Sequence, residues 1–157
     1  MIKSNEVFDV SKYTKFKNSD FDSYQITRIK EGITKKLDIS FYANPKFNWQ
    51  EMDEIIFGLE DKLDVSIYAD YKFNCNQMEQ LRLGLLSRID AAKYANPKYR
   101  WTQMWQLRLG LIDNLDISSY SDPNLDYKQM EKIRKTLLNN KAQESDNLLS
   151  NIIDEFK

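Results

Sequence analysis

The chain has 157 residues, of which 41% are hydrophobic and 30% charged, and this suits one compact soluble domain better than two. Its formal net charge of −1 gives no overall attraction to nucleic acid or anionic membranes, so such binding would need a local patch. The absence of histidine excludes Ser/His/Asp and Cys/His catalysis and most zinc sites, and the single cysteine, Cys75, excludes an internal disulfide framework.

The sequence shows no targeting or membrane segment. The first residues, MIKSNEVFDV, lack the apolar run of a signal peptide, and no stretch approaches the roughly 18 apolar residues that suggest a membrane span. We therefore expect a cytoplasmic protein, with no membrane association, no metal and no cofactor.

A period of 26 residues runs through most of the chain. Tyrosine and methionine recur at this spacing, all four glycines share one phase, and the three prolines share another. The members are Tyr42, Tyr68, Tyr94 and Tyr120; Met52, Met78, Met104 and Met130; Gly32, Gly58, Gly84 and Gly110; and Pro45, Pro97 and Pro123. The pattern predicts about five copies of one structural unit.

The first copy keeps this phase from Phe21 to Ser40, while the segment around Tyr13 carries about three extra residues. Each copy predicts a long helix. In the second copy Asn48 is an N-cap, Glu51 completes a capping box, and Phe47 and Met52 form a hydrophobic staple. The same capping device recurs as Asp22 with Gln25, Asn74 with Gln77, and Asp126 with Gln129.

A shorter helix is expected after each long one, because Asp64, Asp90 and Asp116 can each cap a segment whose apolar residues lie three apart. The unit is then a helix pair. Glycine inside the long helix costs about 1 kcal/mol relative to alanine, so its fixed phase indicates the close approach of a neighbouring backbone.

These units predict an all-α fold, a solenoid-like array of about five 26-residue helix-pair repeats over residues 1–140. Residues 141–157 are predicted to form a polar linker and a C-terminal amphipathic helix. One face of that helix carries Leu148, Leu149, Ile152, Ile153 and Phe156. Packing onto the last unit is the simpler role for this helix; a partner contact or a homodimer through it is the alternative.

The motif Tyr-Ala-x-Pro-x-Phe-x-Trp-x-Gln-Met, followed by Arg-x-Gly-Leu and Leu-Asp-Ile/Val-Ser, resembles a short repeat in proteins of phages and conjugative elements of low-GC Gram-positive bacteria. The resemblance covers roughly residues 21–138. No catalytic role is attached to this repeat, and no site residue is carried over from it. Small proteins of such elements are often inhibitors of host defence, including anti-CRISPR proteins, so the resemblance implies an anti-defence role.

Comparison of equivalent positions separates scaffold residues from exceptions. The column Trp49, Cys75, Trp101 and Tyr127 is interpreted as the first core position of the helix, which makes Cys75 a small buried hydrophobe rather than a nucleophile.

Trp105, in contrast, occupies a column that is otherwise polar, and Arg100 replaces the capping Asn or Asp of the other copies. Two interpretations stay open for Trp105. It forms a contact patch with Arg108 one turn on, or it packs on the tail helix or an adjacent turn.

Two charged sets complete the candidate residues. The basic column Lys30, Arg82, Arg108 and Arg134 either lines a groove for phosphates or acidic surfaces, or pairs with the column Asp38, Asp64, Asp90 and Asp116, and we favour pairing. An acidic run between Tyr42 and Ile67, with a net charge of −4, could dock on a basic effector surface, although a solvated face is the simpler interpretation. The run has six acidic residues, Glu51, Asp53, Glu54, Glu60, Asp61 and Asp64, and the first five are the candidate docking face.

The sequence thus favours a non-catalytic protein-binding module, with Trp105, Arg108, Arg100 and Arg82 as partner-binding residues. Its partner would be a host defence effector that the module occludes. The alternative is nucleic-acid binding through the basic column. An enzyme is disfavoured, since carboxylates such as Glu51 and Glu54 lie on a charged helix face without an evident pocket.

Overall fold

The computed structural model describes residues 8–155, and within this range the chain forms helices and turns without any strand. The predicted all-α class is confirmed. The α-helices are α1 (Ser23–Thr34), α2 (Trp49–Glu60), α3 (Cys75–Leu86), α4 (Trp101–Ile112) and α5 (Tyr127–Glu155); the 3₁₀ helices are η1 (Val10–Lys12), η2 (Asn18–Asp20), η3 (Ile39–Phe41), η4 (Val65–Ile67) and η5 (Ala91–Tyr94).

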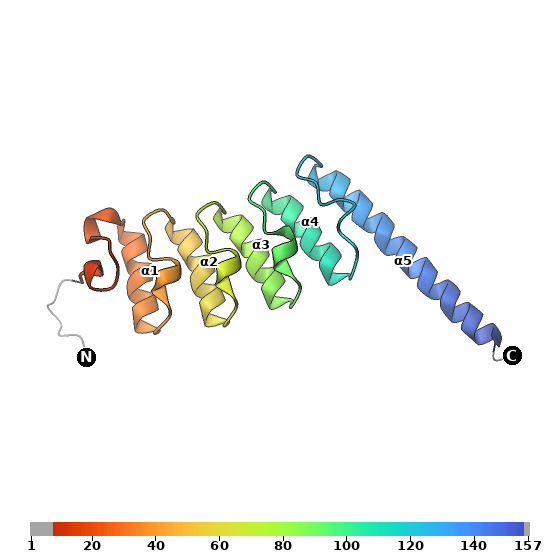
Figure 1. Cartoon of the computed structure of the whole chain (residues 1–157), viewed down its shortest axis with the longest axis horizontal. Coiled ribbons are helices and arrows are strands. Elements are labelled where there is room, and N and C mark those ends of the chain that lie inside the picture. Colours follow the sequence, from red (N-terminus) through yellow and green to blue (C-terminus); the bar gives the residue numbers. More distant parts are fainter. Residues whose placement is uncertain (1–7, 156–157) are drawn as a thin grey trace.

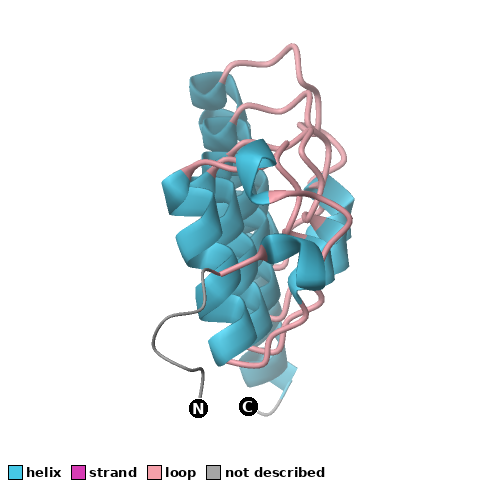
Figure 2. Ribbon diagram, turned by 90° about the vertical axis from the view of Figure 1, so that its left-hand side faces the viewer, coloured by secondary structure: helices cyan, strands magenta, loops and turns pink. Residues whose placement is uncertain are grey.

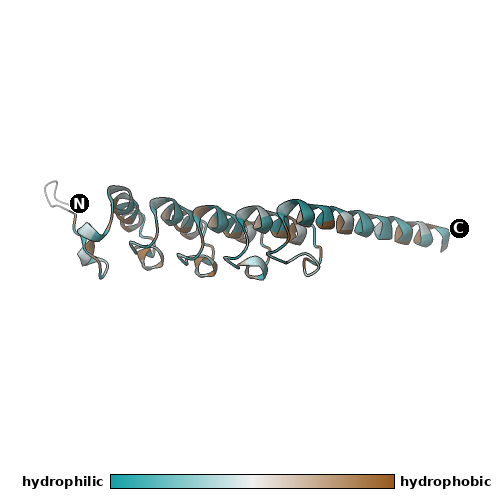
Figure 3. Ribbon diagram, turned by 90° about the horizontal axis from the view of Figure 1, so that it is seen from above, coloured by the Kyte–Doolittle hydropathy of each residue, from teal (hydrophilic) through white to brown (hydrophobic). Residues whose placement is uncertain are grey.

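Helices α1 to α4 and the first half of α5 lie side by side in chain order, and each packs on the next (Figure 1). The 3₁₀ helices and loops form a second layer along one side of this row, as Figure 2 and Figure 3 show. Buried side chains of the second layer, such as Val65 and Tyr68, lie against the helix row close to Gly58. The opposite side of the helix row, here called the outer face, stays open.

The short helix predicted in each unit is a single 3₁₀ turn of three or four residues. Asp38 and Asp64 cap η3 and η4, because their carboxylates accept hydrogen bonds from the backbone N–H of Ser40 (3.0 Å) and Ser66 (3.1 Å). Asp116 accepts in the same way from Ser118. A turn this short still places a tyrosine over the preceding α-helix.

The predicted capping boxes are confirmed at α1, α2, α3 and α5. At α2, for example, Asn48 Oδ1 accepts from the backbone N–H of Glu51 (3.0 Å), while Glu51 Oε2 accepts from that of Asn48 (2.9 Å). The staple residues Phe47 and Met52 are buried. These local signals explain why four of the five α-helices begin at equivalent positions of their units.

Each glycine makes room for the tyrosine ten residues further on. A Cβ atom at Gly110 would lie 1.8 Å from the hydroxyl oxygen of Tyr120, and the other three glycines show the same conflict. The close neighbour is therefore a tyrosine hydroxyl of the same unit, so the prediction of an approaching backbone was wrong. Tyr68 and Tyr94 donate from this position to the carbonyls of Glu54 (3.0 Å) and Gln80 (2.9 Å).

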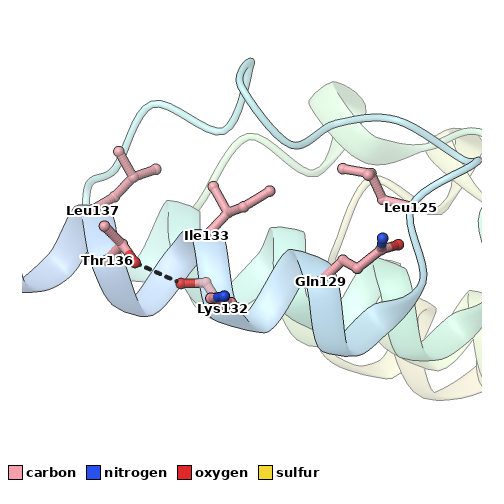
Figure 4. Close-up of a pocket in the computed structure, with 6 residues that line it drawn as sticks. All are labelled: Leu125, Gln129, Lys132, Ile133, Thr136 and Leu137. Atoms are coloured by element: carbon pink, nitrogen blue, oxygen red, sulfur yellow. Dashed lines mark hydrogen bonds between the residues drawn. The ribbon is translucent and has the colours of Figure 1, made fainter.

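The fifth unit has Thr136 in place of glycine and Asp146 in place of the tyrosine. Figure 4 shows the Thr136 hydroxyl, which donates to the carbonyl of Lys132 (3.0 Å), the position that tyrosine hydroxyls reach in earlier units. The glycine and the tyrosine are thus lost together, and one threonine replaces their hydrogen bond.

A glutamine in the first helical turn joins each unit to the next. Besides its capping role, Gln103 donates from Nε2 to the carbonyls of Pro123 (3.0 Å) and Leu125 (2.5 Å). Gln25 and Gln77 make the equivalent bonds. Glu51 occupies this position in the second unit, where its carboxylate has no hydrogen to donate to the loop of the third.

Helix α5 differs most from the prediction. Residues expected to form a linker are helical, so Tyr127–Glu155 is one continuous helix. Just past the C-terminal end of α4, Lys141 Nζ donates to the carbonyls of Asp113 (2.9 Å) and Asn114 (3.2 Å). Beyond this point α5 projects away from the row (Figure 1), so the expected packing of Leu148 and Ile152 onto the last unit was wrong. Phe156 lies outside the described residues.

Candidate protein-interaction face

Apolar side chains gather on the outer face at α3, α4 and the start of α5. On α4, Trp101, Trp105 and Ile112 are 44%, 39% and 40% exposed, and their spacing puts them on one side of the helix. Equivalent positions of the neighbouring units are also exposed and apolar. We call the whole set the α3–α5 face, and its members are Leu86, Trp101, Trp105, Ile112, Tyr127 and Leu138.

Trp101 had been assigned to the core with the rest of its column, and this was wrong. The first residue of the helix lies about 60° around the axis from Met104, at the edge of the buried stripe. In the second unit Trp49 is partly covered by Tyr24 (ring centroids 5.9 Å apart) and by Arg28 (5.5 Å from the ring centroid). In the third unit, the residues equivalent to Tyr24 and Arg28 are Asn76 and Gln80. The ring of Trp101 in the fourth unit remains exposed.

Trp105 stands where every other unit carries a polar residue, and in two of those units the residue forms an ion pair. Asp53 pairs with Arg28 in the second unit, and Glu131 pairs with Lys135 (2.7 Å) in the fifth. The C-terminal part of α5 projects away from the row (Figure 1), and Trp105 is exposed. Two large indole rings one helical turn apart thus face solvent on α4.

The basic column joins consecutive helices instead of lining an open groove. From Nε, Arg82 donates to Glu54 Oε2 (2.8 Å), Arg108 to Gln80 Oε1 (3.2 Å) and Arg134 to Gln106 Oε1 (3.0 Å). The predicted pairing with the Asp column was therefore wrong. Asp38, Asp64 and Asp116 cap turns instead, and Asp90 makes no capping hydrogen bond through its side chain. Lys30 lies over the ring of Phe8 (5.0 Å).

Arg82 and Arg108 differ in the charge of their partners. Arg82 forms an ion pair with Glu54, and both side chains are only 15% exposed, so Arg82 is unavailable as a partner-binding residue. Burial raises the pKa of Glu54, and the hydrogen bond from Arg82 opposes this shift. Arg108 bonds to a neutral amide, which leaves a positive charge beside Trp105 that an acidic group of a partner could complement.

Arg100 is exposed at the N-cap of α4. Its side chain offers no acceptor, and the N–H of Gln103 bonds to the backbone carbonyl of Arg100 instead (2.9 Å). Arg100 also lines a groove of about 290 Å³ between the starts of α4 and α5, with Lys98, Asp126 and Tyr127. A capping residue has been replaced here by a cation at the rim of the α3–α5 face.

The predicted acidic docking face is not present as a surface of free carboxylates. Glu51 is buried, where loss of hydration raises its pKa. Asp53, Glu54 and Glu60 form ion pairs with Arg28, Arg82 and Lys35 of neighbouring helices. Asp61 remains as an exposed member. The net charge of −4 is therefore largely balanced by cations from adjacent units.

An open groove of about 410 Å³ lies on α5 and is lined by Leu125, Gln129, Lys132, Ile133, Thr136 and Leu137 (Figure 4). In earlier units the equivalent space is filled by the segment that carries the buried tyrosine, as Ile117 and Tyr120 do beside Gly110. The groove is thus the uncovered end of the row. The polar side chains of Gln129 and Lys132 do not form a catalytic arrangement in this groove. Elsewhere, residues 8–155 hold no cluster of three or more possible metal-ligating side chains.

Several members of the α3–α5 face could have been found in the sequence. The column Thr34, Glu60, Leu86, Ile112 and Leu138 changes from polar to apolar in the last three units, and such a change marks an exception to the scaffold.

Cys75 is half-buried rather than fully buried as predicted.

No family model, curated protein or solved structure matched the chain. Among the described helices, none combines the length and apolarity that crossing a bilayer requires.

Proposed function

We propose that the chain is a solenoid-like array of about five helix-pair repeats that acts as a non-catalytic protein-binding module. The observation that carries this proposal is the pair of exposed tryptophans, Trp101 and Trp105, on the outer face of α4. Tryptophan and arginine are the residues most enriched at binding hot spots, and here they stand together on a rigid helix.

The proposed binding surface has an apolar centre and a basic rim. Trp101, Trp105 and Ile112 would insert into a hydrophobic groove of the partner, while Arg100 and Arg108 would meet acidic groups around it. Such a surface acts by shape and occupancy. Its mechanism would be to block the site of the partner that it covers.

For the partner class we propose an effector of a bacterial defence system, so that the chain would be an anti-CRISPR-like inhibitor. The support for this class is the resemblance of the repeat to those of phage and conjugative-element proteins. Phage plating on a defended strain that expresses the chain tests it. Recovery of plating with wild type, and not with Trp101→Ala/Trp105→Ala, is the expected result; unchanged protection by every tested defence system would contradict it.

Binding itself is tested by affinity capture from a host lysate with three forms of the chain. Wild type and the control Tyr13→Ala/Tyr71→Ala, which removes two exposed aromatic rings away from α4, should retain the same protein. Trp101→Ala/Trp105→Ala should lose it. Equal recovery by all three forms would place the binding surface elsewhere.

We do not extend the proposal to nucleic acid or to catalysis. Nucleic-acid binding would depend on a row of free cations in the basic column. Its three arginines instead donate to the preceding helix, and they are Arg82, Arg108 and Arg134. A mobility shift at low salt would reopen it.

A further inference from the structure

The projecting part of α5, residues 142–155, is an amphipathic helix with an uncovered apolar face. Leu148, Leu149, Ile152 and Ile153 are 62%, 58%, 42% and 57% exposed. No other segment of residues 8–155 packs on them (Figure 1). A helix of this length has marginal stability in water without tertiary support, so a covering partner would stabilise it.

The apolar face continues towards the packed part of α5 with the spacing of a coiled coil. Leu138, Ala142, Ser145, Leu149 and Ile152 follow one another at intervals of four and three residues. Large side chains stand at both ends of this series and small ones in the middle. At Leu138, Ala142 and Ser145, beside Asp113, the surface forms a shallow groove of about 250 Å³.

Charge divides α5 into two opposite halves. Residues 127–141 contain five basic residues and one acidic residue, a net charge of +4, whereas residues 142–155 contain four acidic residues and no basic one, a net charge of −4. Two α5 helices in antiparallel orientation around a two-fold axis near Ser145 would place residues 135–141, which hold two lysines and no acidic residue, along residues 149–155 of the other copy, which hold two acidic residues and no basic one. A parallel pair would place like charges together.

From the apolar series and this self-complementary charge, we infer that a second copy of the chain covers the projecting helix, forming an antiparallel α5–α5 dimer. Around a two-fold axis near Ser145, Leu138 faces Ile152 of the partner, so two large side chains meet at each end. Ala142 faces Leu149 of the partner, so a small side chain meets a large one nearer the axis. The two rows of helices then extend in opposite directions, and the dimer presents two α3–α5 faces. This inference does not depend on what that face binds.

The test is the mass of the full chain in solution, measured by light scattering on two matched variants. Wild type and Asn147→Glu/Asn151→Glu should have twice the monomer mass of 18.7 kDa. Leu149→Glu/Ile152→Glu, which adds the same charge on the apolar side, should be monomeric. A wild-type chain that stays monomeric overturns the inference, whether it is free, on lipid vesicles or bound to a different protein. A dimer that persists in Leu149→Glu/Ile152→Glu also overturns it.

Orientation is tested by oxidation of single-cysteine variants, each carrying Cys75→Ser. Leu138→Cys mixed with Ile152→Cys should yield a disulfide between the two variants, and neither should cross-link alone. Cross-linking of each variant with itself, and not with the other, would show a parallel pair and contradict the proposed arrangement.

Discussion

At the scale of single residues, buried tyrosine hydroxyls tie each 3₁₀ segment to the α-helix of its own unit. Burial raises the pKa of Tyr68 and Tyr94, and it raises that of Tyr120 to about 12, so these hydroxyls keep their protons and can donate. The fourth unit is the exception, because the Tyr120 hydroxyl is buried and has no hydrogen-bond partner. The tyrosine hydroxyl should therefore contribute differently to the free energy of unfolding at otherwise equivalent positions.

Tyr94→Phe should lower the free energy of unfolding by about 1 kcal/mol, because it removes the bond to the Gln80 carbonyl. Tyr120→Phe removes an unsatisfied hydroxyl of the same shape and should be neutral or stabilising. Chemical denaturation of the two variants checks this difference. Equal destabilisation would show that the hydroxyl acts through packing alone.

Glu51→Gln should stabilise the protein by about 1 kcal/mol at neutral pH, since an amide can donate to the carbonyls of the next loop as Gln77 does. Burial raises the pKa of Glu51 in the folded state. The protonated Glu51 carboxyl therefore contributes to the free energy of unfolding at pH values below the ordinary pKa of glutamate. This contribution is lost as the pH rises through the raised pKa of the folded state.

The gain from Glu51→Gln should accordingly grow with pH over this window and be small in acid. Denaturation midpoints measured across the acidic range test the pH dependence. Gln77→Glu serves as the reverse change and should destabilise the protein at neutral pH. A gain from Glu51→Gln that is independent of pH would contradict the assigned role of the carboxylate.

At the scale of elements, start signals fix most helices. N-caps, capping boxes and staples occur at fixed offsets, and α1, α2 and α3 begin where these signals predict. Helix α4 begins at the same phase although Arg100 offers no capping side chain, because the Gln103 side chain and the packing of Met104 remain in place.

Arg100→Asn should therefore stabilise α4 by about 1 kcal/mol, as expected for a restored N-cap. Thermal unfolding checks the gain, with Lys98→Asn as a neighbouring control. If Arg100 belongs to the binding rim, the more stable variant should also capture less partner. A variant with unchanged stability would show that the backbone carbonyl of Arg100 already satisfies the helix start.

One element, α5, and the exposure of one residue, Trp101, were predicted wrongly for physical reasons. Asn139, Asn140, Ser145 and Asp146 have turn-like composition, but a helix already anchored by packing continues through them at little cost. Trp101 has the spacing of a core residue, and only the identity of its neighbours in the adjacent unit decides whether it is covered. Periodicity therefore predicted the helices better than the face of the candidate site.

At the scale of the whole molecule, contacts pass from each unit to the next, through Gln103 to the following loop and through Arg108 to the preceding helix. The repeat in the sequence predicted this order of units and the scaffold residues that maintain it. It could not predict that the basic column pairs with Glu54 and Gln80, because that choice depends on the rotation of neighbouring helices.

A solenoid-like array predicts that removal of one whole period leaves a folded protein. Deletion of residues 53–78 removes 26 residues and keeps the phase, so the shorter chain should unfold cooperatively at a lower temperature. Circular dichroism during heating provides the measurement. Deletion of 13 residues from the same region, which breaks the phase, should abolish folding, and equal behaviour of both deletions would contradict the array.

Trp101 and Trp105 are proposed to serve binding rather than the fold. The most direct measurement compares the affinity of the captured partner for wild type and for Trp101→Ala/Trp105→Ala, with thermal unfolding of both. We predict an affinity loss of at least about tenfold, equivalent to 1.4 kcal/mol, and nearly unchanged stability. Unchanged affinity, or destabilisation by the roughly 3–5 kcal/mol typical of a truncated core aromatic residue, would contradict the account.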